Sequence, residues 1–132
     1  MNSIYFDHAA TTPMHPAAIE AYVEAASAGP SNPSSLHASG RAARERISAA
    51  RDAIAELLGC SPAEIVFTGS GTESDNSALF GAARAQRERG RTGIVTTAVE
   101  HHAVLNACRR LEAEGFVLTV LPVDEFGRVS LE

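Results

Sequence analysis

The sequence predicts an α/β protein with a mostly parallel sheet flanked by helices. Three short segments rich in β-branched and aromatic residues alternate with two helical segments, an order typical of parallel sheets. The first of these strands, at 64–68, runs into the glycine turn Gly69-Ser70-Gly71, which opens a helix. The composition, 45 % hydrophobic and 20 % charged over 132 residues, is that of an ordinary globular domain.

The N-terminal half is predicted to be mainly helical. In order, its elements are an extended segment at 4–6, a loop at 7–16, a helix at 16–28, a loop at 29–35 and a helix at 36–58. Pro16 is tolerated in the first turn of a helix, and Gly59 is a typical C-terminal stop. The second helix has an apolar face at helical spacing, made of Ile47, Ala50, Ile54, Leu57 and Leu58. Its arginines between Arg41 and Arg51 are expected on a solvated face, paired with acidic residues one turn away.

The C-terminal half is predicted to alternate strands and helices. Ser61-Pro62-Ala63-Glu64 has the form of a capping box, so one helical turn is expected before the strand at 64–68. The remaining elements are a helix at 72–89, a strand at 94–96, a helix at 102–114, a strand at 116–121 and a turn at 124–127. The expected buried stripe of the last helix is Val104, Leu105, Cys108 and Leu111. The end of the chain soon after a third strand is not expected to be a domain boundary.

Composition narrows the classes of function. A net charge of −5 disfavours direct nucleic-acid binding, which requires a basic face. No apolar segment has the length of a signal peptide or the roughly 20 residues of a membrane span. Cys60 and Cys108 form neither a disulfide framework nor a metal-ligand spacing, and are expected to be small core residues. We therefore expect a cytoplasmic protein with no membrane, metal or direct nucleic-acid partner.

The turn Gly69-Ser70-Gly71-Thr72 is the strongest candidate for a binding site. Backbone amides at a strand-to-helix turn have no intrahelical partner, and the helix dipole adds partial positive charge, which favours an anion such as phosphate. The turn is not a P-loop, because no Gly-Lys-Ser/Thr follows, and Ser74 stands where a dinucleotide fingerprint has its third glycine. An alternative interpretation is a tight turn in which Thr72 caps the helix and Asp75 closes a capping box.

The segment Val99-Glu100-His101-His102 lies between a predicted strand and a predicted helix. In a parallel sheet this position shares the carboxyl-end rim with the glycine turn, where ligands bind. An imidazole there can stack on an aromatic ring. The alternative, a solvated histidine at a helix start, is the more frequent situation. Adjacent histidines on a helix point in different directions, which disfavours a metal pair.

Four segments together resemble the cysteine desulfurases of the class V aminotransferase family, which are pyridoxal-phosphate enzymes. The segments are Tyr5 to Pro13, Asn32 to His37 with Gly40-Arg41, Phe67 to Asn76, and Glu100-His101 with Ala103-Val104-Leu105. Their order and approximate spacing match the family over essentially the whole chain. The resemblance implies part of the large domain of fold type I, the aspartate aminotransferase-like fold.

The resemblance also implies roles. Gly71 and Thr72 would bind the phosphate of pyridoxal phosphate, and His101 would stack on its ring and take part in proton transfer. Residues 1–15 would pack with a small domain, and residues 16–132 would be the N-terminal part of the cofactor-binding large domain. The intact protein would be a homodimer, with the loop Asn32–His37 near the interface. It would convert L-cysteine to L-alanine and pass sulfur to an acceptor protein, for iron–sulfur cluster assembly or tRNA thiolation.

Two departures from the family pattern matter. The family more often has Ser-Gly where this chain has Gly69-Ser70. In addition, all 11 basic residues are arginine, so the chain lacks the lysine amine that such enzymes use to bind the cofactor covalently. The family's catalytic cysteine would also lie beyond these residues, and neither Cys60 nor Cys108 matches its position. The resemblance therefore implies the N-terminal part of a longer desulfurase, inactive alone.

Two other functions stay open at this stage. The same half-site could serve a selenocysteine lyase or another class V enzyme. The chain could instead be a non-catalytic remnant or an interaction module. An uncovered sheet edge and apolar helix faces would then favour self-association.

Overall fold

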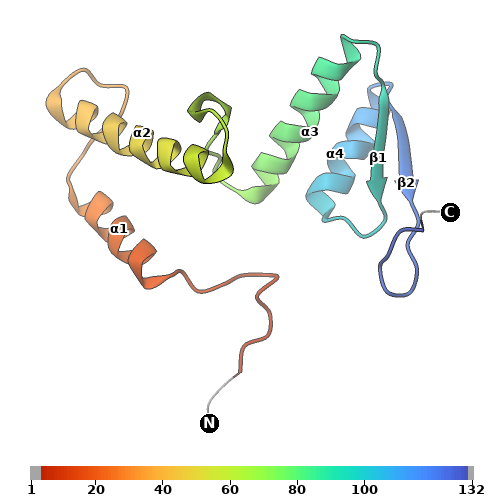
Figure 1. The fold of residues 1–132 in the computed structure, drawn as a ribbon, viewed down its shortest axis with the longest axis horizontal. Helices are drawn as coiled ribbons and strands as arrows, with labels where there is room; N and C mark the ends of the chain where they lie inside the picture. The colour runs from red at the N-terminus through yellow and green to blue at the C-terminus, as the bar shows by residue number, and fades with distance from the viewer. Residues whose placement is uncertain (1–3, 131–132) are drawn as a thin grey trace. The chain divides into compact units, whose positions relative to one another are not determined.

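The computed structural model describes residues 4–130 of the chain. The chain divides into two compact units, Met1–Ile65 and Val66–Glu132, whose elements are drawn in Figure 1. Within residues 4–130, no helix combines the length and the apolar character that a bilayer crossing demands.

The first unit consists of helices that begin and end close to the expected positions. They are α1 (Pro16–Ser27), α2 (Ala38–Leu58) and the single 3₁₀ turn η1 (Pro62–Glu64). A histidine caps each α-helix, because Nδ1 of His15 accepts from the Ala17 amide and Nδ1 of His37 accepts from the Gly40 amide, both at 3.3 Å. Gly59 ends α2 in the left-handed conformation with φ 67°, which a glycine adopts without strain. The predicted capping box of Ser61 and Glu64 is confirmed.

The loop before α2 is fastened to the first turns of that helix. Arg44 donates to the carbonyls of Pro33 and Ser35, at 2.8 and 3.2 Å, and Arg41 donates to the Leu36 carbonyl. The prediction that these arginines pair with acidic residues one turn away is therefore wrong. Nearby loop carbonyls, fixed by the turn, are better placed acceptors than the helix's own carboxylates. Gly40 is required here, because a Cβ on it would lie 2.5 Å from the Ser35 carbonyl oxygen.

The predicted strand at 64–68 is not a strand in the structure. Ile65 is extended, with φ −92° and ψ 121°, but within residues 4–130 no neighbouring strand pairs with this segment. Its side chains are correspondingly open, with Val66 76 % exposed and Phe67 48 % exposed. High β-propensity describes side chains that suit a half-buried pleated surface. It does not provide the partner strand that a ladder requires.

The second unit has the predicted α/β character. Its elements are α3 (Gly71–Arg87), β1 (Gly93–Thr97), α4 (His102–Ala113) and β2 (Val117–Leu121). The two strands pair in parallel, with a register that runs from Gly93 opposite Val117 to Thr97 opposite Leu121. Helix α4 is the crossover between them and contacts both strands, while α3 packs on α4 (Figure 1). Parallel pairing with a helical crossover confirms the predicted fold class.

The core of this unit lies around α4. Its fully buried side chains are Cys108 and Leu111, which confirms half of the predicted stripe. The other half is wrong, because Ala103 and Ala107 are buried while Val104 and Leu105 are only half-buried. Helix α4 contacts α3 and the strands at once, and small side chains permit that close approach. Phe116 and Thr96 complete the buried set.

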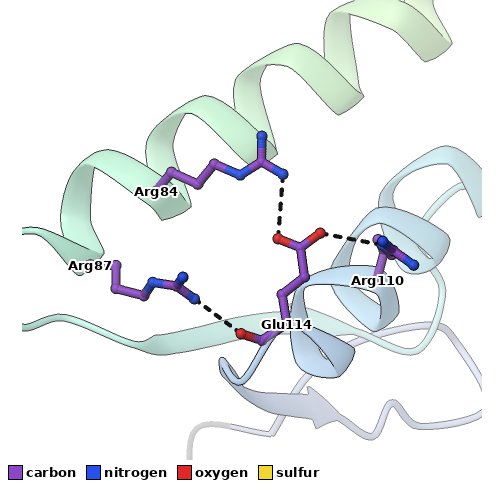
Figure 2. Close-up of polar contacts among 4 residues, drawn as sticks. All are labelled: Arg84, Arg87, Arg110 and Glu114. Carbon is purple, nitrogen blue, oxygen red and sulfur yellow. Dashed lines mark hydrogen bonds and ion pairs between the residues drawn. The ribbon is translucent and has the colours of Figure 1, made fainter.

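An arginine cluster joins the C-terminal ends of α3 and α4 (Figure 2). The Glu114 carboxylate accepts from Arg84 at 3.3 Å and from Arg110 at 3.2 Å. Arg87 donates to the Glu114 backbone carbonyl at 3.0 Å and lies over the Phe116 ring. The hydrogen bond from Arg84, reinforced by Arg110, lowers the pKa of Glu114. The cluster therefore links α3 and α4 at their C-terminal ends.

Candidate functional site

The sequence-predicted site residues lie at one end of the second unit. In Figure 1 the N-termini of α3 and α4 lie at the end toward which β1 and β2 point. Gly71 and Thr72 form the first turn of α3, and His101 immediately precedes α4. In parallel sheets this carboxyl-end rim is where ligands bind.

The turn before α3 is organised by Ser70 and Glu73. Ser70 is the N-cap, and its Oγ accepts from the Glu73 amide at 3.2 Å. The Glu73 carboxylate in turn accepts from the Gly69 amide at 2.8 Å. The alternative in which Thr72 caps the helix and Asp75 closes the box is therefore wrong, because the serine two residues earlier already occupies the cap. Thr72 is instead a first-turn residue.

The amides of Gly71 and Thr72 remain open. Neither amide donates a hydrogen bond to any part of the chain that the structure describes. Apart from its chain neighbours and the backbone of its own helix, no atom lies within 4 Å of the point where a Gly71 Cβ would be, and Gly71 and Thr72 are both exposed. With the Ser70 amide, which donates to no described residue either, these adjacent donors at the positive end of a 17-residue helix fit a phosphate group.

Hydroxyl groups brace the same turn. Thr68 Oγ1 donates to the Ser70 carbonyl at 3.1 Å and also hydrogen-bonds to Ser74 Oγ. Because the Thr68 proton goes to the carbonyl, the Ser74 hydroxyl is the donor in the second bond. None of the four residues in this network, Thr68, Ser70, Glu73 and Ser74, was predicted to shape the site. A usable signal was present for two of them, since Ser70-Gly71-Thr72-Glu73 has the spacing of a capping box.

His101 is both exposed and held in one orientation. It is the N-cap of α4, and its Nδ1 accepts from the Ala103 amide at 3.1 Å. This bond requires Nδ1 to be unprotonated, so the neutral ring carries its proton on Nε2. The His102 ring lies 6.3 Å away, tilted by 54°. The arrangement leaves a flat imidazole with one available N–H donor.

The cysteines are poor candidates for nucleophilic chemistry. Cys108 is fully buried, which confirms it as a core residue. Burial, followed by the nearby Glu100 carboxylate, raises the pKa of its thiol against a smaller opposing effect of the Thr96 hydrogen bond. A raised pKa leaves little of the reactive thiolate. Cys60 is only half-buried just after α2, so the expectation that it is a core residue is wrong.

The loop Asn32–His37 belongs to the first unit. Its hydrogen bonds to Arg41 and Arg44 give it a defined conformation. Its expected place near a subunit interface stays a prediction, as do the individual roles of Gly71, Thr72 and His101.

Comparison with known proteins gives consistent matches. A family model described as aminotransferase class-V matches residues 4–132. A putative cysteine desulfurase IscS 1 of Bacillus subtilis is 48 % identical over 130 residues, covering 98 % of this chain and 34 % of that protein. An IscS-like cysteine desulfurase of Mycobacterium tuberculosis is 56 % identical over 129 residues, covering 96 % and 33 % respectively.

Solved structures give the same result for the fold. A NifS-like protein superposes with a TM-score of 0.82 at 37 % identity, covering 92 % of this chain and 33 % of that one. A structure described as SspA in complex with cysteine superposes with a TM-score of 0.79 at 39 % identity, covering 91 % and 35 %. The chain thus spans about a third of the length of the relatives it matches.

Proposed function

Because the chain belongs to the class-V aminotransferase family, we propose that it forms the phosphate- and ring-binding part of a pyridoxal-phosphate-dependent cysteine desulfurase. Its similarity to proteins named cysteine desulfurases, at 48 % and 56 % identity, supports this choice of activity. The same naming favours L-cysteine over selenocysteine as substrate. The observation that carries the proposal is the pair of open amides at the start of α3.

In this proposal the phosphate of the cofactor is bound by the first turn of α3. The Gly71 and Thr72 amides have no hydrogen-bond partner among the described residues, and the Thr72 side chain adds a hydroxyl donor at an exposed position. Each hydrogen bond to a charged acceptor is worth about 1.5–3 kcal/mol. The cofactor, when bound, supplies a ring that withdraws electrons from the substrate carbon.

His101 supplies a stacking surface for that ring in the same proposal. The hydrogen bond from the Ala103 amide to Nδ1 fixes the plane of the imidazole. It also leaves Nε2 as the position through which a proton can be donated. Acting as a base at Nδ1 would first require loss of the helix cap.

The remaining parts of the reaction are assigned to protein outside these 132 residues. The chain contains no lysine, so we propose that the amine that binds the cofactor covalently lies elsewhere in a longer protein. In the overall reaction the carbon–sulfur bond of L-cysteine breaks, the sulfur passes to a cysteine thiolate as a persulfide, and alanine leaves. The buried Cys108 is not that thiolate.

Several finer assignments accompany this function. The homodimer, the cytoplasmic location and a sulfur-acceptor protein, either an iron–sulfur scaffold or a tRNA-thiolation protein, are proposed with it. The placement of residues 1–15 beside a small domain is part of the same proposal.

The phosphate site can be tested on the 132-residue chain by following its ¹⁵N amide resonances. Pyridoxal phosphate and inorganic phosphate should shift the Gly71 and Thr72 resonances, whereas pyridoxal, which lacks the phosphate, should not. The variant Gly71→Pro deletes one donor at a helix position that accepts proline, and the extended Ser70, with φ −164° and ψ 162°, suits a following proline. We expect roughly tenfold weaker phosphate binding with α3 intact. Equal binding by this variant would contradict the assignment.

The reaction itself is tested on the complete product of the gene that encodes this segment. Alanine release is measured from L-cysteine and, as the control substrate, from L-selenocysteine. Release from L-cysteine supports the proposal. A marked preference for selenocysteine would replace it with the lyase.

A further inference from the structure

We propose that Glu73 is a positioning residue, which holds the turn before α3 so that the Gly71 and Thr72 amides share one acceptor. The inference rests on the function proposed above and concerns how the same site is shaped. Glu73 itself is not assigned to touch the phosphate.

The geometry of the turn singles out Glu73. Its amide donates to Ser70 Oγ at 3.2 Å, and its carboxylate accepts from the Gly69 amide at 2.8 Å. Glu73 is therefore hydrogen-bonded to both residues that precede the helix, Gly69 and Ser70. Between these ties lie Gly71 and Thr72, whose amides donate to no residue that the structure describes. The two hydrogen bonds thus use the Gly69 and Glu73 amides and leave the adjacent Ser70, Gly71 and Thr72 amides open.

Gly69 allows the carboxylate to lie against the backbone. A Cβ at this position would be 3.2 Å from Glu73 Oε2, which is tighter than ordinary van der Waals contact. A side chain at position 69 would therefore require the Glu73 carboxylate to shift by a few tenths of an ångström. The φ of Gly69 is not in the left-handed region, so this contact, and not the backbone conformation, is what a side chain there would disturb.

Glu73 has two opposite effects on a bound phosphate. Its hydrogen bonds order the turn, which favours binding because less conformational entropy is lost. Its negative charge in the first turn stabilises the free helix but competes with the phosphate for the positive end of the dipole. The two effects can be separated, because glutamine keeps the carbonyl acceptor without the charge and alanine keeps neither.

The experiment compares Glu73→Gln with Glu73→Ala in the 132-residue chain. Pyridoxal phosphate is titrated, pyridoxal is the phosphate-free control, and hydrogen exchange of the Gly69 amide reports the tie directly. We expect E73Q to bind at least as tightly as the unmodified chain. We expect E73A to bind roughly fivefold more weakly than E73Q, the ratio that corresponds to the loss of one helix cap, with faster exchange at Gly69. Because both variants are uncharged, this ratio reports positioning alone.

Each outcome bears on a different statement. Equal affinity of E73Q and E73A, or unchanged exchange at Gly69 in E73A, would overturn the positioning role and leave the phosphate site standing. No shift at Gly71 and Thr72 in the unmodified chain would overturn the proposed function, and the inference with it. Tighter binding by both variants to the same extent would show that the charge of Glu73, not its hydrogen bond, affects the site, and would also overturn the positioning role.

Discussion

The interactions that stabilise the interior of each unit differ between the two units of the chain. In the second unit, apolar side chains around α4 are buried, including Leu111 and Phe116. Of residues 4–65, which the structure describes in the first unit, only Gly40 and Ala55 are buried, and α1 has no buried residue. Its order comes instead from hydrogen bonds of side chains to the backbone, such as those of Arg44 to the loop before α2.

This difference shows which unit has a buried apolar core of its own. Burial of apolar surface is the main stabilising contribution in a folded domain, and single hydrogen bonds contribute about 1 kcal/mol each. The second unit combines a core with the open amides of α3. The first unit presents exposed apolar side chains, among them Ile19 and Leu57, that suit burial against additional protein.

The largest effect is expected from Leu111→Ala in the core of the second unit. Leu111 is fully buried, so the change should reduce the free energy of unfolding by about 2–4 kcal/mol. Each unit contains one cysteine, Cys60 or Cys108, so the rates of thiol labelling report on the units separately. Labelling of Cys108 should accelerate and that of Cys60 should not. The control is Leu57→Ala, at a side chain that is 86 % exposed. An equal loss of unfolding free energy in this variant would contradict the statement that apolar burial stabilises mainly the second unit.

A smaller effect is expected from Gly40→Ala in the first unit. The added Cβ would lie 2.5 Å from the Ser35 carbonyl oxygen and 2.8 Å from that of Asn32, so the loop must shift, at a cost of about 1–3 kcal/mol. Hydrogen exchange of the Ser35 amide, which donates to Asn32, measures this shift. The matched control is Gly81→Ala within α3, where no atom lies within 4 Å. There the gain in helix propensity should raise stability by up to about 1 kcal/mol. Equal responses at the two positions would contradict the close packing at Gly40.

The smallest effect is expected from Glu114→Gln in the arginine cluster. Because Arg84 and Arg110 lower the pKa of Glu114, the folded chain binds this proton less readily than the unfolded chain. Its contribution to stability is therefore complete above the usual carboxyl pKa and is lost as pH falls through the lowered one. E114Q should lose stability less steeply on acidification, in urea unfolding followed from neutral to acid pH. Glu112→Gln is the control on the same helix, and a similar change of slope there would refute the assignment.

Local signals in the sequence predicted most of the fold. The proline at the start of α1, the glycine at the end of α2 and the capping box of Ser61 and Glu64 lie where expected. The strand at 64–68 was predicted wrongly because pairing depends on a partner that propensity cannot reveal. The stripe of α4 was half wrong for a related reason. Periodicity identifies a buried face, but Ala103 and Ala107 are buried because three elements contact that helix.

The candidate site was predicted in position but not in detail. The open amides of Gly71 and Thr72 follow from the start of a helix at the glycine turn, which the sequence indicates, although the segment before the turn is not a strand. The cap was assigned to Thr72 rather than to Ser70, since several capping residues compete within four positions. Only the structure shows that Glu73 reaches Gly69 and that His101 uses Nδ1 to cap α4.

The parallel pairing of β1 and β2 also constrains the order of events during folding. Two parallel strands cannot be joined by a tight turn, so closing the ladder from Gly93–Val117 to Thr97–Leu121 requires the chain between them, which contains α4, to cross back along the sheet. His101 lies at the start of that crossover. We therefore expect the imidazole and the sheet rim to be positioned together, and a variant that slows docking of α4 to delay both.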